Sequence, residues 1–81
     1  MAHLIRSKPD ENMRRFYEVQ LAPTLFGEWS LWREWGRSGQ AGKLRLQTFE
    51  SQAQAEAAQA RSIQGKLRRG YLYAARQADH L

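Results

Sequence analysis

The sequence contains no cysteine, so neither disulfides nor thiolate metal sites can stabilise its fold. Long apolar runs are missing too: the longest, residues 71–75, is far shorter than a membrane span. The N-terminus also lacks the apolar core of a signal peptide. We therefore expect a cytoplasmic protein that has no membrane partner.

Acidic residues are scarce as well, with eight aspartates and glutamates against thirteen lysines and arginines. The net charge of +5 and the isoelectric point near 10.2 favour polyanionic partners through long-range attraction. The acids are scattered without paired-carboxylate or metal-ligand spacing, and His3 and His80 lie in terminal segments and are expected to be solvated. The sequence therefore predicts no enzyme, no metal site and no cofactor.

Alternating side chains predict a small sheet within a chain of 81 residues, which is one domain with a marginal core. Residues 4–5 are expected to form a short edge strand, and residues 16–21, 29–35 and 43–49 the longer strands. The middle strand has a tryptophan on each face, so one face of the sheet should be only partly covered. The first and last of the longer strands should direct these residues into the core: Tyr17, Val19, Leu21, Leu44, Leu46 and Thr48.

A single long helix is predicted at residues 53–69. Ser51 is a suitable N-cap with Gln54 at the third helical position, which is a capping-box pattern, and Gly70 is a natural left-handed terminator. The tail, residues 71–81, could add a short edge strand or a helical turn. The helix is expected to face the sheet with an apolar stripe made of Ala53, Ala57, Ala60, Ile63 and Leu67.

Three glycines, spaced three apart, separate the tryptophan-rich strand from a basic strand and predict a hairpin with a glycine-rich tip. Glycine suits positions where φ is positive or where another backbone approaches closely. Aromatic and cationic side chains flank this loop, so it could hold an anionic, planar or sugar-bearing ligand. The loop residues concerned are Trp35, Gly36, Arg37, Gly39, Gly42 and Lys43.

The tripeptide Trp35, Gly36, Arg37 lies inside the pattern Trp-x-x-x-x-x-Trp-Gly-Arg-x-Gly-x-x-Gly. This chain resembles the WGR domain, which occurs in poly(ADP-ribose) polymerases and in small or modular bacterial proteins. The resemblance covers nearly the whole chain, although Ser38 stands where the family often has an apolar residue and the middle of the helix offers only alanines and Gln59. Further matching positions are Phe16, Tyr17, Gln20, Leu21, Phe49, Lys66, Gly70 and Tyr71.

The resemblance implies an α+β domain in which one long helix packs across a small twisted antiparallel sheet of about four strands. It also implies one domain over residues 1–81, with a core at 14–73, an N-terminal edge segment at 1–12 and a tail at 74–81. A non-catalytic role in nucleic-acid binding follows, on DNA more than RNA and at ends or nicks, with Trp35 stacking on a sugar and Arg37 contacting DNA. The expected interface residues are Trp35, Gly36, Arg37, Gly39, Lys43, Arg45 and Lys66.

The residues themselves leave alternatives open. Trp35 could equally support the loop, Arg37 could cap a carbonyl or pair with Glu34, and Lys66 could simply complement the helix dipole. The domain could also be a protein-interaction module that uses the same tryptophan and arginine to bind an acidic partner. DNA is favoured because residues 35–49 include three basic residues and no acidic one. The sequence leaves the oligomeric state open.

Overall fold

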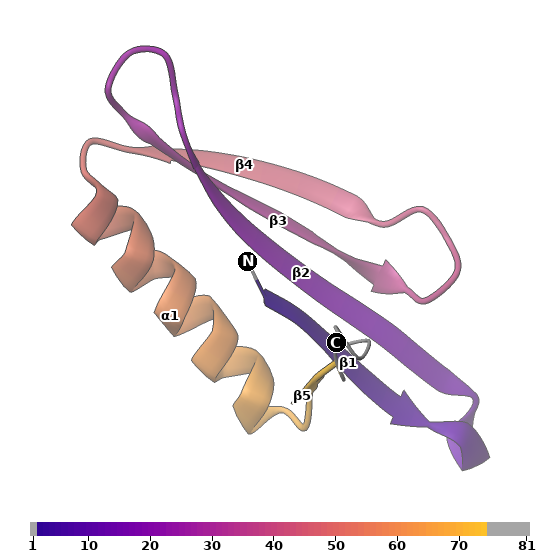
Figure 1. Cartoon of the computed structure of the whole chain (residues 1–81). Coiled ribbons are helices and arrows are strands. Elements are labelled where there is room, and N and C mark those ends of the chain that lie inside the picture. Colours follow the sequence, from indigo (N-terminus) through magenta and orange to yellow (C-terminus); the bar gives the residue numbers. More distant parts are fainter. Residues whose placement is uncertain (1, 75–81) are drawn as a thin grey trace, which may run out of the picture.

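The computed structural model, which describes residues 2–74, has one helix packed across one face of a five-stranded antiparallel sheet (Figure 1). The predicted α+β class is confirmed, and the sheet has one strand more than expected. No helix in this part of the chain is long and apolar enough to cross a membrane. The elements in chain order are β1 (Ala2–Lys8), the 3-10 turn η1 (Pro9–Glu11), β2 (Met13–Pro23), β3 (Trp29–Arg37), β4 (Lys43–Phe49), α1 (Gln52–Arg68) and β5 (Leu72–Tyr73).

The strands lie in the order β4-β3-β2-β1-β5, so successive hairpins build most of the sheet. β5 returns from the end of α1 and pairs only with Leu4 and Ile5 of β1. Register aligns Leu4 with Tyr17, Tyr17 with Trp35, and Trp35 with Lys43. Because cross-strand partners share a face, this row lies on one side of the sheet.

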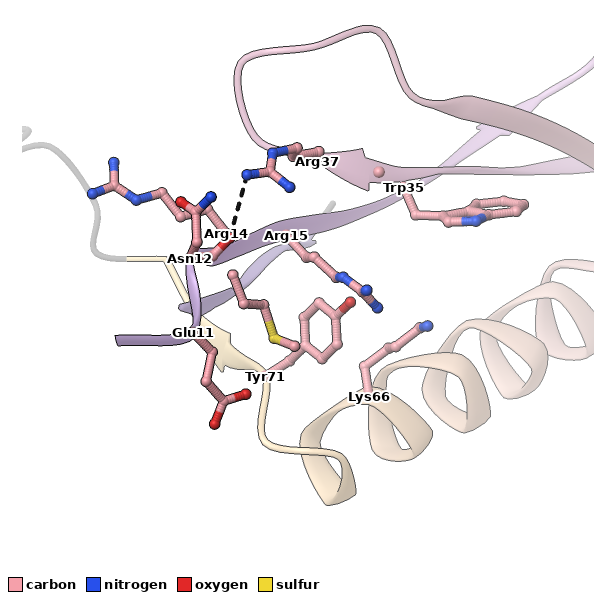
Figure 2. Close-up of a pocket in the computed structure, with 10 residues that line it drawn as sticks. Glu11, Asn12, Arg14, Arg15, Trp35, Arg37, Lys66 and Tyr71 are labelled. Atoms are coloured by element: carbon pink, nitrogen blue, oxygen red, sulfur yellow. Dashed lines mark hydrogen bonds between the residues drawn. The ribbon is translucent and has the colours of Figure 1, made fainter. Parts of the chain in front are cut away.

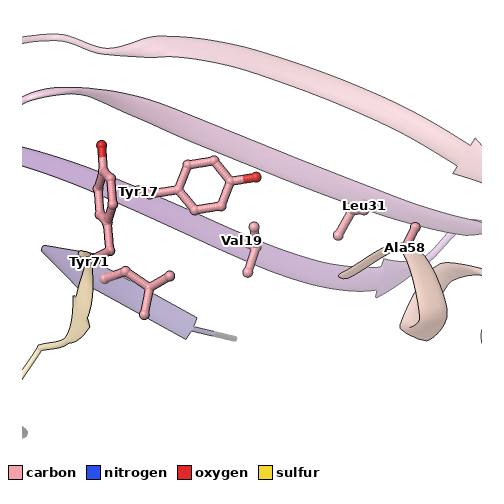
Figure 3. Packing of buried hydrophobic residues seen from close by; sticks show 6 residues of the cluster. Tyr17, Val19, Leu31, Ala58 and Tyr71 are labelled. Carbon is pink, nitrogen blue, oxygen red and sulfur yellow. The ribbon is translucent and has the colours of Figure 1, made fainter. Parts of the chain in front are cut away.

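The core lies between the sheet and α1 (Figure 3). Tyr17 and Val19 are buried and Leu21 packs against them, which confirms the inward face predicted for residues 16–21. The helix contributes a small residue to this cluster, so it can lie close to the strands. The buried cluster consists of Leu4, Tyr17, Val19, Leu31, Ala58 and Tyr71.

The inward face predicted for β4 is wrong. Leu44 and Leu46 are 57% and 59% exposed, and Thr48 is exposed as well. Pairing with β3 sets Gln47 opposite buried Leu31, so the odd-numbered residues of β4 share the helix side. Side chains alternate with a period of two, so the register set by the preceding hairpin decides the face of every residue in the strand.

No helix within residues 2–74 covers the second face of the sheet, and we call this face the open face. Trp32 lies on it, 38% exposed and paired with Leu46, whereas its neighbour Leu31 is fully buried on the helix side. This confirms that one of the two tryptophan-bearing faces is only partly covered.

The predicted signals for the ends of the helix are confirmed. The backbone N–H of Gln54 donates to Ser51 Oγ at 3.2 Å, and the Gln54 side chain accepts from the N–H of Glu50 at 3.2 Å. Gly70 has φ +97°, as a left-handed terminator requires.

The predicted stripe of the helix is partly wrong. Ala53, Ala57 and Ala60 are exposed, whereas Ala55 and Ala58 are buried; the expected Ile63 and Leu67 do pack against the core. Alanine occupies positions on every side of the first half of the helix, so hydrophobicity alone did not distinguish the buried side.

Candidate nucleic-acid interface

The loop between β3 and β4 needs glycine for two reasons, a positive φ angle and a close backbone approach. Gly39 has φ +84°, a conformation that favours glycine. At Gly42 a Cβ atom would lie 2.5 Å from the backbone oxygen of Trp35 and 2.8 Å from Cζ of Phe16. At Gly36 it would lie 3.0 Å from the Cα of Gly42, so these two glycines allow the ends of the loop to approach closely.

The loop is also tied to the neighbouring strand. The N–H of Ser38 donates to the carbonyl of Arg14 at 3.0 Å, and the N–H of Gln40 donates to the carbonyl of Arg37 at 3.1 Å. The first bond holds the end of β3 against β2, so the sheet fixes the position of the tryptophan that precedes the loop, and the second bond lies within the loop.

Trp35 lies on the helix side of the sheet and is half-buried. Its ring centroid is 6.5 Å from that of Tyr17, at an interplanar angle of 39°, and the side chain packs against the core. Trp35 also lines two clefts that meet beside it. It therefore supports the fold and borders a solvent-filled space at the same time.

The first cleft, about 620 Å³ in volume, lies between the ends of β2 and β3 and the last turns of α1. In Figure 2, Arg15 and Lys66 point into the space between Tyr71 and Trp35. Among the described residues, Glu11 is the one acidic residue of this lining. The cationic residues of the lining are Arg14, Arg15, Arg37 and Lys66.

The second cleft, about 450 Å³, continues from Trp35 and Lys66 toward β4, and none of the described residues that line it is acidic. Arg33 crosses it: Nε donates to Ser62 Oγ at 3.1 Å and Nη1 donates to Gln47 Oε1 at 2.9 Å. Both acceptors are neutral, so this guanidinium is held in place without being neutralised. We call the two clefts together the basic groove, whose cations are Arg14, Arg15, Arg33, Arg37, Arg45 and Lys66.

The register places like charges opposite one another on the helix side. Arg15 pairs with Arg37, and Arg33 pairs with Arg45. Like charges directly opposite each other destabilise a sheet. The sheet strands of residues 2–74 place no acidic residue on this side, whereas Glu18 and Glu34 pair on the open face. The acidic side chains of these strands thus lie on the open face, together with Arg14, whereas every charged strand residue described on the helix side is a cation, so that side attracts anions.

Lys66 lies against two aromatic rings. Its Nζ lies 4.8 Å from the ring centroid of Tyr17 and 5.3 Å from that of Tyr71, and such contacts with ring faces attract a cation. Burial lowers the pKa of Lys66 from its ordinary value, and the charges of Arg69 and Arg15 lower that pKa further. An anion bound in the groove would favour the charged form of Lys66 and so offset both effects.

The predicted interface residues are only partly brought together. Trp35, Gly36, Arg37 and Lys66 line the first cleft, and Arg45 lines the second. Gly39 and Lys43 line neither cleft, because one lies at the loop tip and the other begins the edge strand. Lys43 is nevertheless the register partner of Trp35.

The structure distinguishes between the two alternatives given for Arg37, capping of a carbonyl and pairing with Glu34. Its Nη2 donates to the carbonyl of Asn12 at 3.3 Å, so it does cap a carbonyl. Glu34 lies on the open face, opposite Glu18, and is not its partner. The exposed guanidinium still borders the first cleft.

Sequence reasoning missed Arg14, Arg15 and Arg33 as groove residues. Two of them form a basic doublet just before the first predicted core strand, and Arg33 shares the alternation of Trp35 within its strand. Because Arg33 and Trp35 are two positions apart in one strand, their side chains lie on the same face, and this spacing could have identified Arg33 from the sequence.

His3 is exposed, which confirms the solvated position predicted for it, but it has a carboxylate neighbour that the sequence did not predict. Its Nδ1 lies 3.5 Å from Oε2 of Glu18, and its ring stacks on Phe16 with centroids 6.3 Å apart. Pairing of β1 with β2 brings these residues together across fifteen positions of sequence, which no local pattern could indicate. His80 lies outside the described residues.

Comparison with known proteins gives two matches. A family model described as WGR domain matches residues 1–78. The chain is also 35% identical over 66 residues to a protein of Sinorhizobium fredii (strain NBRC 101917 / NGR234) named "Uncharacterized protein y4dW", an alignment that covers 82% of this chain and 32% of that protein. The chain thus spans about a third of the length of this relative. No solved structure matches.

Proposed function

The chain belongs to the WGR domain family of non-catalytic nucleic-acid-binding modules, and we propose that its ligand is DNA, bound at ends or nicks. The observation that carries this proposal is the basic groove, whose two clefts both include Trp35 and are lined, among the described residues, by six cations and one carboxylate, Glu11. Such a charge excess attracts the phosphate backbone and releases its counterions.

The arrangement of the groove suits a strand that passes Trp35. Cations lie on both sides of this residue, with Arg15 in the first cleft, Arg45 in the second and Lys66 between them. Phosphates contacting these residues would bring a sugar or base to the indole. Stacking requires an uncovered sugar or base face, which a strand end or a nick provides and a closed duplex does not.

Sequence specificity is not expected from this geometry. Phosphate contacts position a protein on DNA, whereas base-edge contacts in a groove specify sequence. The one helix among the described residues is poorly suited to the major groove, since its first half has no lysine or arginine before Arg61 and carries Glu56. Binding should therefore depend on DNA structure and on salt.

Titration of the domain against a closed circular duplex and the same duplex carrying a nick tests this proposal, with blunt DNA, single-stranded DNA and duplex RNA in parallel at two salt concentrations. We expect tighter binding to the nicked circle, and weaker binding to every ligand at higher salt. Equal affinity for the two circles would refute recognition of ends or nicks. No binding to any nucleic acid at tens of micromolar protein in low salt would refute the function itself, and binding of polyglutamate instead would favour the protein-interaction alternative.

A further inference from the structure

β4 is the terminal strand of the sheet, and no strand within residues 2–74 pairs with its outer edge. Residues 43–48 are all exposed, and Phe49 alone is half-buried. The outer edge of such a strand presents unpaired backbone N–H and C=O groups that can pair with another strand. This edge is seven residues long, which is enough for an extended peptide.

The two sides of β4 differ in chemistry. On the open face, Leu44 and Leu46 are 57% and 59% exposed, and Leu46 stands opposite the partly exposed Trp32. On the helix side, Lys43 and Arg45 stand opposite Trp35 and Arg33. An added strand would therefore meet apolar side chains on one face and cations on the other.

These charges decide which strand the edge can accept. A second copy of β4 would bring another Lys43 and Arg45 to a face that already holds Arg33, and like charges on one face of a sheet repel. Exposed edge strands commonly carry cations that prevent such self-pairing. A strand whose acidic side chains face Lys43 and Arg45 and whose apolar side chains face the leucines is complementary on both sides.

We propose that the edge of β4 docks an extended, alternately acidic and apolar segment of a partner protein as a further strand of the sheet. Backbone hydrogen bonds supply affinity in this mode of recognition, and the alternate side chains supply specificity. The site does not depend on DNA binding, although the two ligands would compete for Arg45, which also lines the basic groove.

A synthetic seven-residue peptide of alternating valine and glutamate serves as the probe, added to the domain without nucleic acid. Amide hydrogen exchange followed by NMR should slow at every second residue of 43–49, those whose N–H groups point to the outer edge, because an added strand engages these free groups. A peptide with lysine in place of glutamate, and a peptide of the same composition without alternation, should leave this exchange unchanged.

Matched variants test whether the peptide binds at the edge of β4 or at any exposed apolar surface. L44S/L46S should bind the peptide about tenfold more weakly or worse, since both leucines lose their apolar contacts. L25S/F26S is the control: its residues at the β2–β3 hairpin tip are 98% and 86% exposed but lie outside β4, so the peptide should bind as to the wild type. K43E/R45E should reverse the preference in favour of the lysine peptide, which tests the charges independently of the leucines.

Several results would overturn the proposal. Unchanged exchange in β4 at millimolar peptide, or equal peptide affinity in L44S/L46S, would show that the edge docks no such strand. Spectral changes confined to groove residues such as Arg14 and Arg37 would show simple charge attraction to the basic groove. A dimer in sedimentation that L44S/L46S dissociates would assign the edge to a second copy of the chain.

Discussion

Trp35→Ala should weaken both folding and DNA binding, because this side chain packs on Tyr17 and borders both clefts. Complete removal of a buried tryptophan costs about 3–5 kcal/mol of unfolding free energy. Trp35 is half-buried at the rim of the core, so we expect about half of this, about 2 kcal/mol. In a domain of this size each kcal/mol lowers the melting temperature by about 4–8 °C, so calorimetry should record a decrease of about 8–16 °C.

The loss of binding should be separable from the loss of stability. A stacked base is worth about 1–3 kcal/mol by alanine substitution, which corresponds to about a 5- to 150-fold weaker affinity. No charge is removed, so the dependence of affinity on salt should hardly change. The titration has to be made well below the melting temperature of the variant, where the protein is folded. A folded Trp35→Ala variant with wild-type affinity for nicked DNA would refute the contact assigned to this residue.

Trp32→Ala provides a matched control in the same strand. Trp32 lies on the open face and is 38% exposed, so its removal should lower the melting temperature and leave DNA affinity unchanged. If both variants lost DNA binding equally, the groove could not be the binding face.

Local signals predicted much of the fold. Ser51 with Gln54 marked the start of the helix, and Gly70 marked its end, because capping depends on residues a few positions apart. Alternation in β2 identified Tyr17 and Val19 as core residues, because this pattern also depends on residues close together in the sequence. The order of these signals along the chain also carried the resemblance to the family.

The orientation of β4 could not be predicted in this way. Leu44 and Leu46 alternate with polar residues as an inward-facing pair would, and only pairing with β3 shows that they face away from the helix. Leu44 and Leu46 lie on the face that no helix of residues 2–74 covers, whereas Phe49 of the same strand lies on the helix side and packs against the core. Burial on such a strand is decided by distant elements.

The residues of the site likewise could not all be predicted from local sequence patterns. Trp35 and Arg37 are close together in the sequence, next to the glycine loop. Arg15 comes from another strand and joins them only through the register of β2 and β3. Like-charged arginines that stand opposite each other are costly for the sheet, and a bound polyanion would offset that cost. This links the like-charged pairs on the helix side of the sheet to the proposed ligand.

Lys43→Ala should flatten the plot of log affinity against log salt by about one unit if Lys43 contacts a phosphate, and an unchanged slope would exclude that contact. Gly42→Ala should destabilise the domain by about 1–3 kcal/mol, because its Cβ would lie 2.5 Å from a backbone oxygen, whereas Gly65→Ala, with nothing within 4 Å, should stabilise the helix by about 0.5–1 kcal/mol; thermal melting of the pair checks both signs. Lys66 should make DNA binding sensitive to alkaline pH. Burial, followed by Arg69 and Arg15, lowers the pKa of Lys66 below 10.5 in the free protein, and a bound phosphate raises that pKa again, so the complex takes up protons as it forms. Affinity at constant ionic strength should therefore fall as pH rises through the lowered pKa. The contribution of Lys66 to stability has the opposite sign: between its folded pKa and 10.5 the unfolded chain binds more protons, so stability rises with pH in that window. Lys66→Arg keeps the charge throughout this range and should remove the decline in affinity; an equal decline in wild type and variant would show that Lys66 does not contact the phosphate.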